Sequence, residues 1–92
     1  MSPEQQEQLE REQFRGAAAE RTYNGYIKDF CEQKRLVLFE SFRNLPLTAT
    51  DELMEVKRML YAVDTLETEV LMEIKTGEMA TQALSKLEET QH

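Results

Sequence analysis

One short break between two long periodic segments is the feature that most constrains how this chain can fold. Residues 44–50 read Asn-Leu-Pro-Leu-Thr-Ala-Thr. Pro46 lacks a backbone N–H and disfavours helical geometry at the residue before it, so a helix cannot continue through this point. A connection of about six residues is short enough to place two helices next to each other and antiparallel. The sequence therefore predicts an all-α fold built on an antiparallel helical hairpin.

The segment before the break, residues 22–43, has the apolar periodicity of a helix. Its apolar side chains recur at steps of three and four residues, which places them on one stripe. They are Tyr23, Tyr26, Ile27, Phe30, Val37, Leu38 and Phe42, with Leu36 and Phe39 widening the stripe. We expect this stripe to pack against the second helix, so that Phe30 is buried.

The segment after the break begins at Thr48 or Thr50, which are both helix-capping residue types. Its main apolar seam, with a spacing close to that of a coiled coil, consists of Val56, Met59, Val63, Leu66, Val70 and Ile74. Gly77 continues this seam. A glycine there can end a helix or let another backbone approach. We expect a kink or break at 76–77, with the helix resuming from Glu78.

The first residues form a third segment of different chemistry. Ser2, Pro3 and Gln5 have the pattern of a capping box, which predicts a helix start. Residues 4–13 contain a single apolar residue, Leu9, so this helix has no face to bury and is expected to be partly frayed. The predicted organisation is a polar N-terminal helix at 1–21, a hairpin with a C-terminal helical segment at 22–87, and a flexible tail at 88–92.

The second long helix has more apolar rows than one neighbouring helix can cover. Outside the main seam these rows contain Leu53, Met54, Leu60, Tyr61, Leu71, Met72 and Met79. Exposed apolar patches usually mark interfaces, and methionines make an adaptable contact surface. A chain of 92 residues also buries a small core on its own. We therefore expect a homo-oligomeric helical bundle that uses these residues. The alternative is a monomer in which the terminal segments cover the rows.

The net charge of −7 is unevenly distributed. Residues 1–46 carry eight acids and seven bases, whereas residues 47–92 carry ten acids and four bases. Acidic proteins are poorly suited to nucleic acid and anionic membranes, which bind through Lys and Arg. A base-free cluster is formed by Asp64, Glu67, Glu69 and Glu73. It is either a solvated helix face or a docking face for a basic partner.

The residue types that support catalysis or metal binding are nearly absent. Cys31 and His92 are the single cysteine and the single histidine. We therefore expect no metal cluster, no histidine base beside a nucleophile, no cofactor and no enzymatic activity. Cys31 is expected to be a buried structural thiol, with an intermolecular disulfide as the alternative. Tyr23 and Lys34 combine an aromatic and a base, which allows either core packing or a nucleotide-type ligand at a subunit boundary.

No apolar run reaches the roughly 18–20 residues of a membrane span, and the N-terminus lacks the pattern of a signal peptide. We therefore expect a cytoplasmic location and no membrane partner.

The order of several residues resembles short helical-hairpin proteins encoded by tailed bacteriophages and prophages. The matching residues, within about 30–85, are Phe30, Phe39, Phe42, Arg43, Pro46, Asp51, Glu52, Leu53, Leu60, Leu66, Glu67, Ile74, Thr76, Gly77, Glu78, Met79 and Ala80. Such proteins are often encoded among virion-morphogenesis genes. The resemblance implies a location in the host cytoplasm or the virion, and it carries no functional residues.

Three functional hypotheses follow from these patterns. The first is a non-enzymatic helical protein of phage origin that acts in particle assembly, through self-association or by binding another phage or host protein. The second is a small acidic inhibitor of a host protein. The third is a binder of a nucleotide-type ligand at a subunit boundary.

Overall fold

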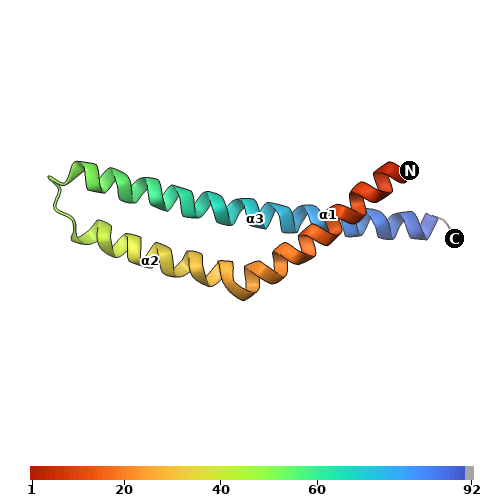
Figure 1. Ribbon diagram of the computed structural model, residues 1–92, viewed down its shortest axis with the longest axis horizontal. Coiled ribbons are helices and arrows are strands. Elements are labelled where there is room, and N and C mark those ends of the chain that lie inside the picture. Colours follow the sequence, from red (N-terminus) through yellow and green to blue (C-terminus); the bar gives the residue numbers. More distant parts are fainter. Residues whose placement is uncertain (91–92) are drawn as a thin grey trace.

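The computed structural model describes residues 1–90, and nearly all of that range is helical. In chain order the elements are α1 (Pro3–Thr22), the π-helical turn η1 (Tyr23–Ile27), α2 (Lys28–Asn44) and α3 (Thr50–Thr90). Residues 1–90 contain no strand, which confirms the predicted all-α class. The molecule measures 67 × 22 × 14 Å, and α3 extends along most of its length (Figure 1).

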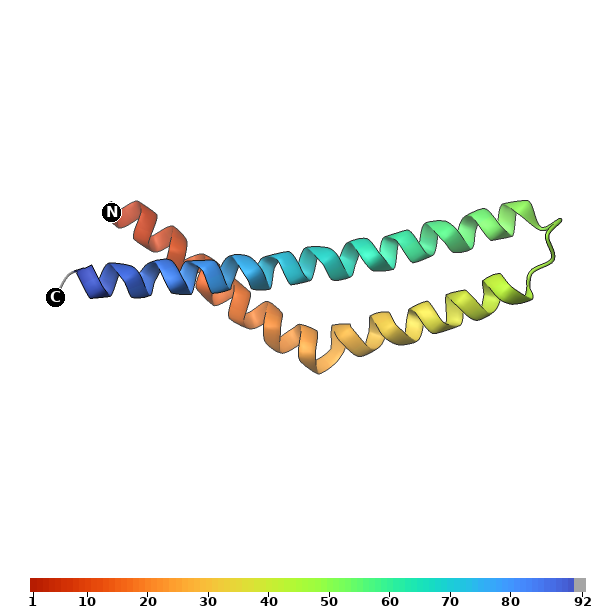
Figure 2. The same ribbon diagram turned by 180° about the vertical axis from the view of Figure 1, so that it is seen from behind.

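The break at Pro46 separates α2 from α3 as predicted. Leu45 has an extended backbone with ψ of 137°, as expected for a residue that precedes proline. Its N–H still donates to Ser41 O at 3.1 Å, and Ala49 N–H donates to Pro46 O at 3.0 Å across the turn. α3 then begins at Thr50. α2 and α3 pack against each other and run in opposite directions (Figures 1 and 2).

The bend between α1 and α2 lies at η1. In this wider turn the N–H of Lys28 donates to Tyr23 O, five residues back, instead of four. Such π-bulges are a recognised cause of helix kinks. The bend directs α1 across α3, so that both chain ends lie at the end of the molecule opposite the 45–49 connection (Figure 1). Apolar periodicity does not predict this bend.

The capping box at Ser2 is present as predicted, and α1 packs on α3 through glycine. Gly16 and Gly77 are both buried. A Cβ built on Gly16 would lie 2.6 Å from Gly77 Cα, so the two backbones are in direct contact. The prediction that the first helix has no face to bury is therefore wrong, because α1 buries backbone rather than large side chains. Fraying of 1–21 stays a prediction.

α3 is continuous through Gly77, so the predicted kink at 76–77 is wrong. The second role considered for this glycine, close approach of another backbone, is the one observed. Thr81 Oγ1 donates to Gly77 O at 3.0 Å, within an unbroken helix. Residues 88–90 of the predicted tail also belong to α3, and residues 91–92 of that tail lie outside the described range.

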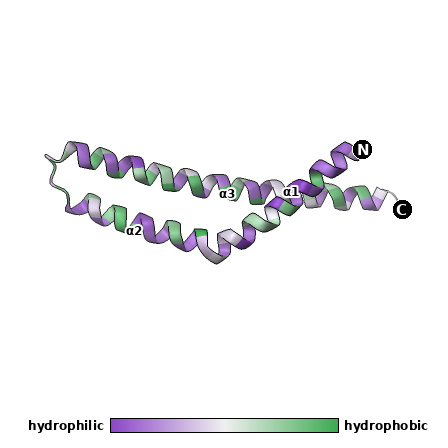
Figure 3. Ribbon diagram, viewed as in Figure 1, coloured by the Kyte–Doolittle hydropathy of each residue, from purple (hydrophilic) through white to green (hydrophobic). Residues whose placement is uncertain are grey.

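The core is a narrow cluster of small and medium side chains between α2 and α3. Its buried members are Cys31, Leu38, Val56 and Val63, with Ile27, Leu45 and Leu60 packed against them. The predicted stripes are therefore partly wrong: Phe30 is 45% exposed and Leu66 is 46% exposed. Two helices leave little room between them, so compact residues occupy the contact and aromatic rings lie beside it. Apolar residues recur along the whole length of both helices (Figure 3).

Candidate interaction surfaces of the helix pair

A half-buried ion-pair network joins η1, α2 and α3. Arg35 Nη1 lies 3.1 Å from Asp64 Oδ1, and Arg35 Nη2 lies 2.9 Å from Glu67 Oε1. The hydroxyl of Tyr23 donates to Glu67 Oε2 at 3.1 Å. The side chains of Arg35 and Glu67 are 24% and 18% exposed, so these charge-assisted hydrogen bonds are partly shielded from water. The network fixes the register between α2 and α3.

The pKa shifts of Tyr23, Cys31 and Arg35 keep these three groups in their ordinary protonation states. Burial raises the pKa of the Tyr23 phenol, and the hydrogen bond to Glu67 raises it further. Burial also raises the pKa of the Cys31 thiol, as does the negative charge of Glu67. For Arg35, burial acts to lower the pKa, but the hydrogen bonds and charges of Glu67 and Asp64 outweigh it and raise the pKa.

The thiol of Cys31 is fully buried, which confirms the prediction of a buried cysteine. A neutral, enclosed thiol is a poor nucleophile, because the thiolate is the reactive form. The contacts of Arg35 with Asp64 and Glu67 link α2 to α3 beside this thiol. The hydroxyl of Tyr23, one of the two residues considered for a ligand at a subunit boundary, donates to Glu67. Lys34, the other residue considered for that ligand, is half-buried.

The four residues of the predicted acidic docking face do not lie on one surface. Asp64 and Glu67 pair with Arg35. Glu69 and Glu73 are exposed, and their helical positions place them on the other side of α3. The clustering of these four acids in the sequence did not predict a common face, because residues within a ten-residue stretch point to several sides of a helix.

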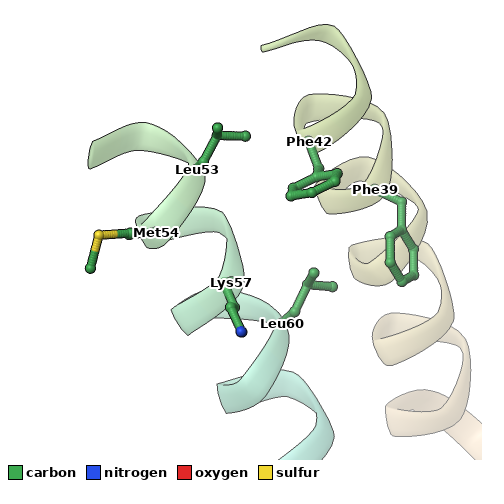
Figure 4. Close-up of a pocket in the computed structure, with 6 residues that line it drawn as sticks. All are labelled: Phe39, Phe42, Leu53, Met54, Lys57 and Leu60. Carbon is green, nitrogen blue, oxygen red and sulfur yellow. The ribbon is translucent and has the colours of Figure 1, made fainter. Parts of the chain in front are cut away.

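The side of the α2–α3 pair that carries Arg35 and Asp64 is called here the neutral flank. Residues seven apart return to the same side of a packed helix, so this flank comprises positions 28, 32, 35, 39 and 42 of α2 and positions 53, 54, 57, 60, 61, 64, 67, 68, 71, 74, 75 and 78 of α3. Near the 45–49 connection it forms an apolar groove lined by Phe39, Phe42, Leu53, Met54, Lys57 and Leu60. Figure 4 shows Leu53 and Leu60 pointing toward α2 and Phe42 pointing toward α3.

The opposite side, the acidic flank, has a different composition. It comprises positions 26, 30, 33, 34, 37, 40, 41 and 44 of α2 and positions 52, 55, 59, 62, 66, 69 and 73 of α3. Its exposed large apolar side chains are Tyr26, Phe30, Val37, Met59 and Leu66. Five acids occupy these positions, Glu40, Glu52, Glu55, Glu69 and Glu73, against a single base, the half-buried Lys34.

The structure brings most of the predicted interface residues together on the neutral flank. These are Leu53, Met54, Leu60, Tyr61 and Leu71. Met72 and Met79 are exposed too, but their helical positions place them on the face of α3 that is turned away from α2. Phe39 and Phe42 also line the groove of this flank, although the apolar periodicity of the sequence assigned them to the intramolecular stripe. Their spacing from Arg35, at four and seven residues, is the signal that places them beside the ion pair.

Within residues 1–90 no group of three or more His, Cys, Asp or Glu side chains is arranged to hold a metal ion. No helix in the described part of the chain is both long and apolar enough to cross a membrane.

No protein-family model, curated protein or solved structure matches this chain.

Proposed function

We propose that this chain is a non-enzymatic assembly protein, an antiparallel helical hairpin that self-associates into a helical bundle. The observation that carries the proposal is its large exposed surface. The chain exposes 7269 Å², whereas a compact monomer of 10.8 kDa exposes about 5,500 Å². Its radius of gyration is 19.5 Å, compared with about 12 Å for a compact domain of this length.

The excess surface is large enough for a stable interface. It amounts to about 1,700 Å² per chain, and a standard interface buries roughly 800 Å² per partner. Much of this surface is apolar, because large exposed apolar side chains outnumber the buried ones. Exposed apolar side chains that gather on one side of a small protein are typical of an interaction site. Self-association would supply the burial that two helices alone do not achieve.

The biological setting is also part of the proposal. The resemblance to hairpin proteins of tailed phages supports a role in particle assembly, with the host cytoplasm or the virion as the location. An elongated molecule 67 Å long with exposed apolar side chains along one side is a suitable subunit for such a particle. Another phage protein could bind the same surface.

Measuring the mass of the full-length chain by light scattering coupled to size exclusion tests this proposal. The expected mass is at least twice the monomer value of 10.8 kDa, with a shift toward the monomer on dilution. A single species of monomer mass at all concentrations, up to the solubility limit, would refute self-association.

A second candidate function, inhibition of a basic host protein, is favoured by the acidic flank. Its apolar centre with a carboxylate rim is complementary to an amphipathic helix with Lys or Arg at its edges. Binding of a synthetic helix of that kind should weaken with salt and with the double substitution Glu55→Gln and Glu69→Gln. Binding that neither salt nor these substitutions change would exclude this mode.

A further inference from the structure

We infer that the second copy docks on the neutral flank, and that a twofold axis parallel to the helices relates the two copies. In this arrangement α2 of each copy packs on α3 of the other. The inference rests on the proposed self-association and specifies the surface and the orientation that it uses. Charge complementarity and the position of the apolar groove support it.

Charge distinguishes the two flanks. The neutral flank carries four bases and four acids: Lys28, Arg35, Lys57, Lys75, Glu32, Asp64, Glu67 and Glu78. The acidic flank carries five acids and one base, Lys34, at its positions. If two copies joined through their acidic flanks, ten carboxylates would approach one another, and like-charge contacts at an interface are costly. The neutral flank buries its apolar side chains without this repulsion.

Charge also selects the orientation. α2 carries four bases and three acids, for a net charge of +1, whereas α3 carries ten acids and four bases, for a net charge of −6. A twofold axis perpendicular to the helices would stack one α3 on the other. An axis parallel to the helices puts each α3 opposite the nearly neutral α2 and the two acidic helices on a diagonal. Every neighbouring pair of helices is then antiparallel, as in up-down-up-down four-helix bundles.

The apolar groove fits this arrangement. A rotation about an axis parallel to the helices keeps each residue at its own level along the bundle. The groove of one copy therefore meets the groove of the other, with Phe39 and Phe42 of one copy opposite Leu53 and Met54 of the second. Phe42 is 51% exposed and Met54 is 54% exposed in the single chain. Pairing the grooves covers both residues.

A distance between spin labels tests the orientation. Met79 is exposed and lies outside the neutral flank, so Met79→Cys in a Cys31→Ala background gives one labelled site per chain. The parallel axis predicts a label separation of about 30 Å, from helix spacings of 8–10 Å and the lengths of the label side chains. The perpendicular axis predicts more than about 45 Å, since α3 rises 1.5 Å per residue on either side of the groove.

Paired substitutions test the choice of flank. Phe42→Ala removes a ring from the neutral flank, and Phe30→Ala removes a ring of similar exposure from the acidic flank. Phe42→Ala should weaken self-association by tenfold or more, as expected for an aromatic anchor, whereas Phe30→Ala should change it less than twofold. Circular dichroism of both variants checks that helical content is retained.

The outcomes separate this inference from the function on which it rests. A labelled protein of monomer mass would overturn the proposed function. A stable dimer with a label separation above about 45 Å, or one weakened by Phe30→Ala and not by Phe42→Ala, would overturn the arrangement and leave self-association standing.

Discussion

The crossing of α1 over α3 makes a sharp prediction about the substitution Gly16→Ala. The added Cβ would lie 2.6 Å from Gly77 Cα and 3.2 Å from Glu73 O, and both are backbone atoms. Ordinary contact begins at 3.4 Å, so the two helices must separate by about 0.8 Å. Neither neighbouring atom can move as a side chain would. The whole crossing must therefore open, which also loosens the packing around Ala80.

Two opposing effects determine the magnitude. Overpacking of this kind typically costs about 1–3 kcal/mol, whereas replacing glycine by alanine inside a helix gains about 1 kcal/mol. Gly16→Ala should therefore lower the free energy of unfolding by about 0–2 kcal/mol. Gly25→Ala provides the matched control, because no atom lies within 4 Å of its added Cβ and its φ is not positive. This control should raise the free energy of unfolding by about 0.5–1 kcal/mol.

Urea unfolding followed by circular dichroism at a fixed protein concentration measures both values. The double variant Gly16→Ala with Gly77→Ala adds a check on coupling: once the first methyl group has separated the helices, the second should cost less than it does alone. If Gly16→Ala stabilised the protein as much as Gly25→Ala, the close backbone contact between α1 and α3 would be refuted.

Three further predictions concern the α2–α3 contact. Arg35→Gln should lower the free energy of unfolding by about 1–2 kcal/mol, since it removes the positive partner of the half-buried Glu67 and leaves it the Tyr23 hydroxyl. The exposed Arg58–Glu55 pair predicts a change within about 0.5 kcal/mol for Arg58→Gln. Equal effects of the two substitutions in urea unfolding would contradict the structural role of Arg35. Leu38→Ala should cost about 2–5 kcal/mol as a buried large-to-small change, and Phe30→Ala should cost less because its ring is half-exposed; the reverse order in the same assay would mean that the core has been misplaced. Burial raises the pKa of Cys31 above 9.0 and that of Tyr23 above 10.0, so in the unfolded chain both groups lose their protons first as pH rises. The stability linked to the two groups is complete below about pH 9 and is lost as pH rises through their folded-state pKa values. When the free energy of unfolding is measured against pH, the double variant Tyr23→Phe with Cys31→Ala should lose less stability at alkaline pH than the original protein. An equal loss of stability in both proteins would exclude Tyr23 and Cys31 as its source.

The sequence predicts the features of this fold that depend on local chemistry. The proline break and the capping box at Ser2 follow from backbone geometry that each residue type imposes. The start of α3 at Thr50 is one of the two starts, Thr48 and Thr50, that the sequence left open. The burial of Cys31 follows from its small, apolar side chain. These features require no knowledge of how the helices cross.

Features that depend on the choice between equivalent faces are not predictable from periodicity. Val56 and Val63 can be joined into a seam with Met59 and Leu66 or with Leu60 and Glu67, because both sets recur every seven residues. The second set faces α2 in the structure, because Arg35 pairs with Glu67 on that side. A prediction that counts apolar residues excludes Glu67 from the seam because it is an acid. It therefore selects the row of Met59 and Leu66 instead of the row of Leu60 and Glu67.

The crossing of α1 was missed for a related reason. Hydrophobic periodicity depends on apolar side chains. The contact between the backbones of Gly16 and Gly77 involves no side chain, so it leaves no trace in that periodicity. The interface residues stay a prediction, and five of the seven lie together on the neutral flank. The two aromatic residues of that flank on α2, Phe39 and Phe42, were assigned to the intramolecular core.

The π-helical turn at Tyr23–Ile27 has a consequence for how this chain tolerates insertions and deletions. Removing one residue from this turn would convert it to an ordinary α-helical turn and so remove the wide turn that bends α1 away from the axis of α2. α1 would then lose the direction that brings Gly16 onto Gly77. A change of length in the 45–49 connection would not redirect α1 in this way. Length variation should therefore be accepted at one end of the molecule and rejected at the other.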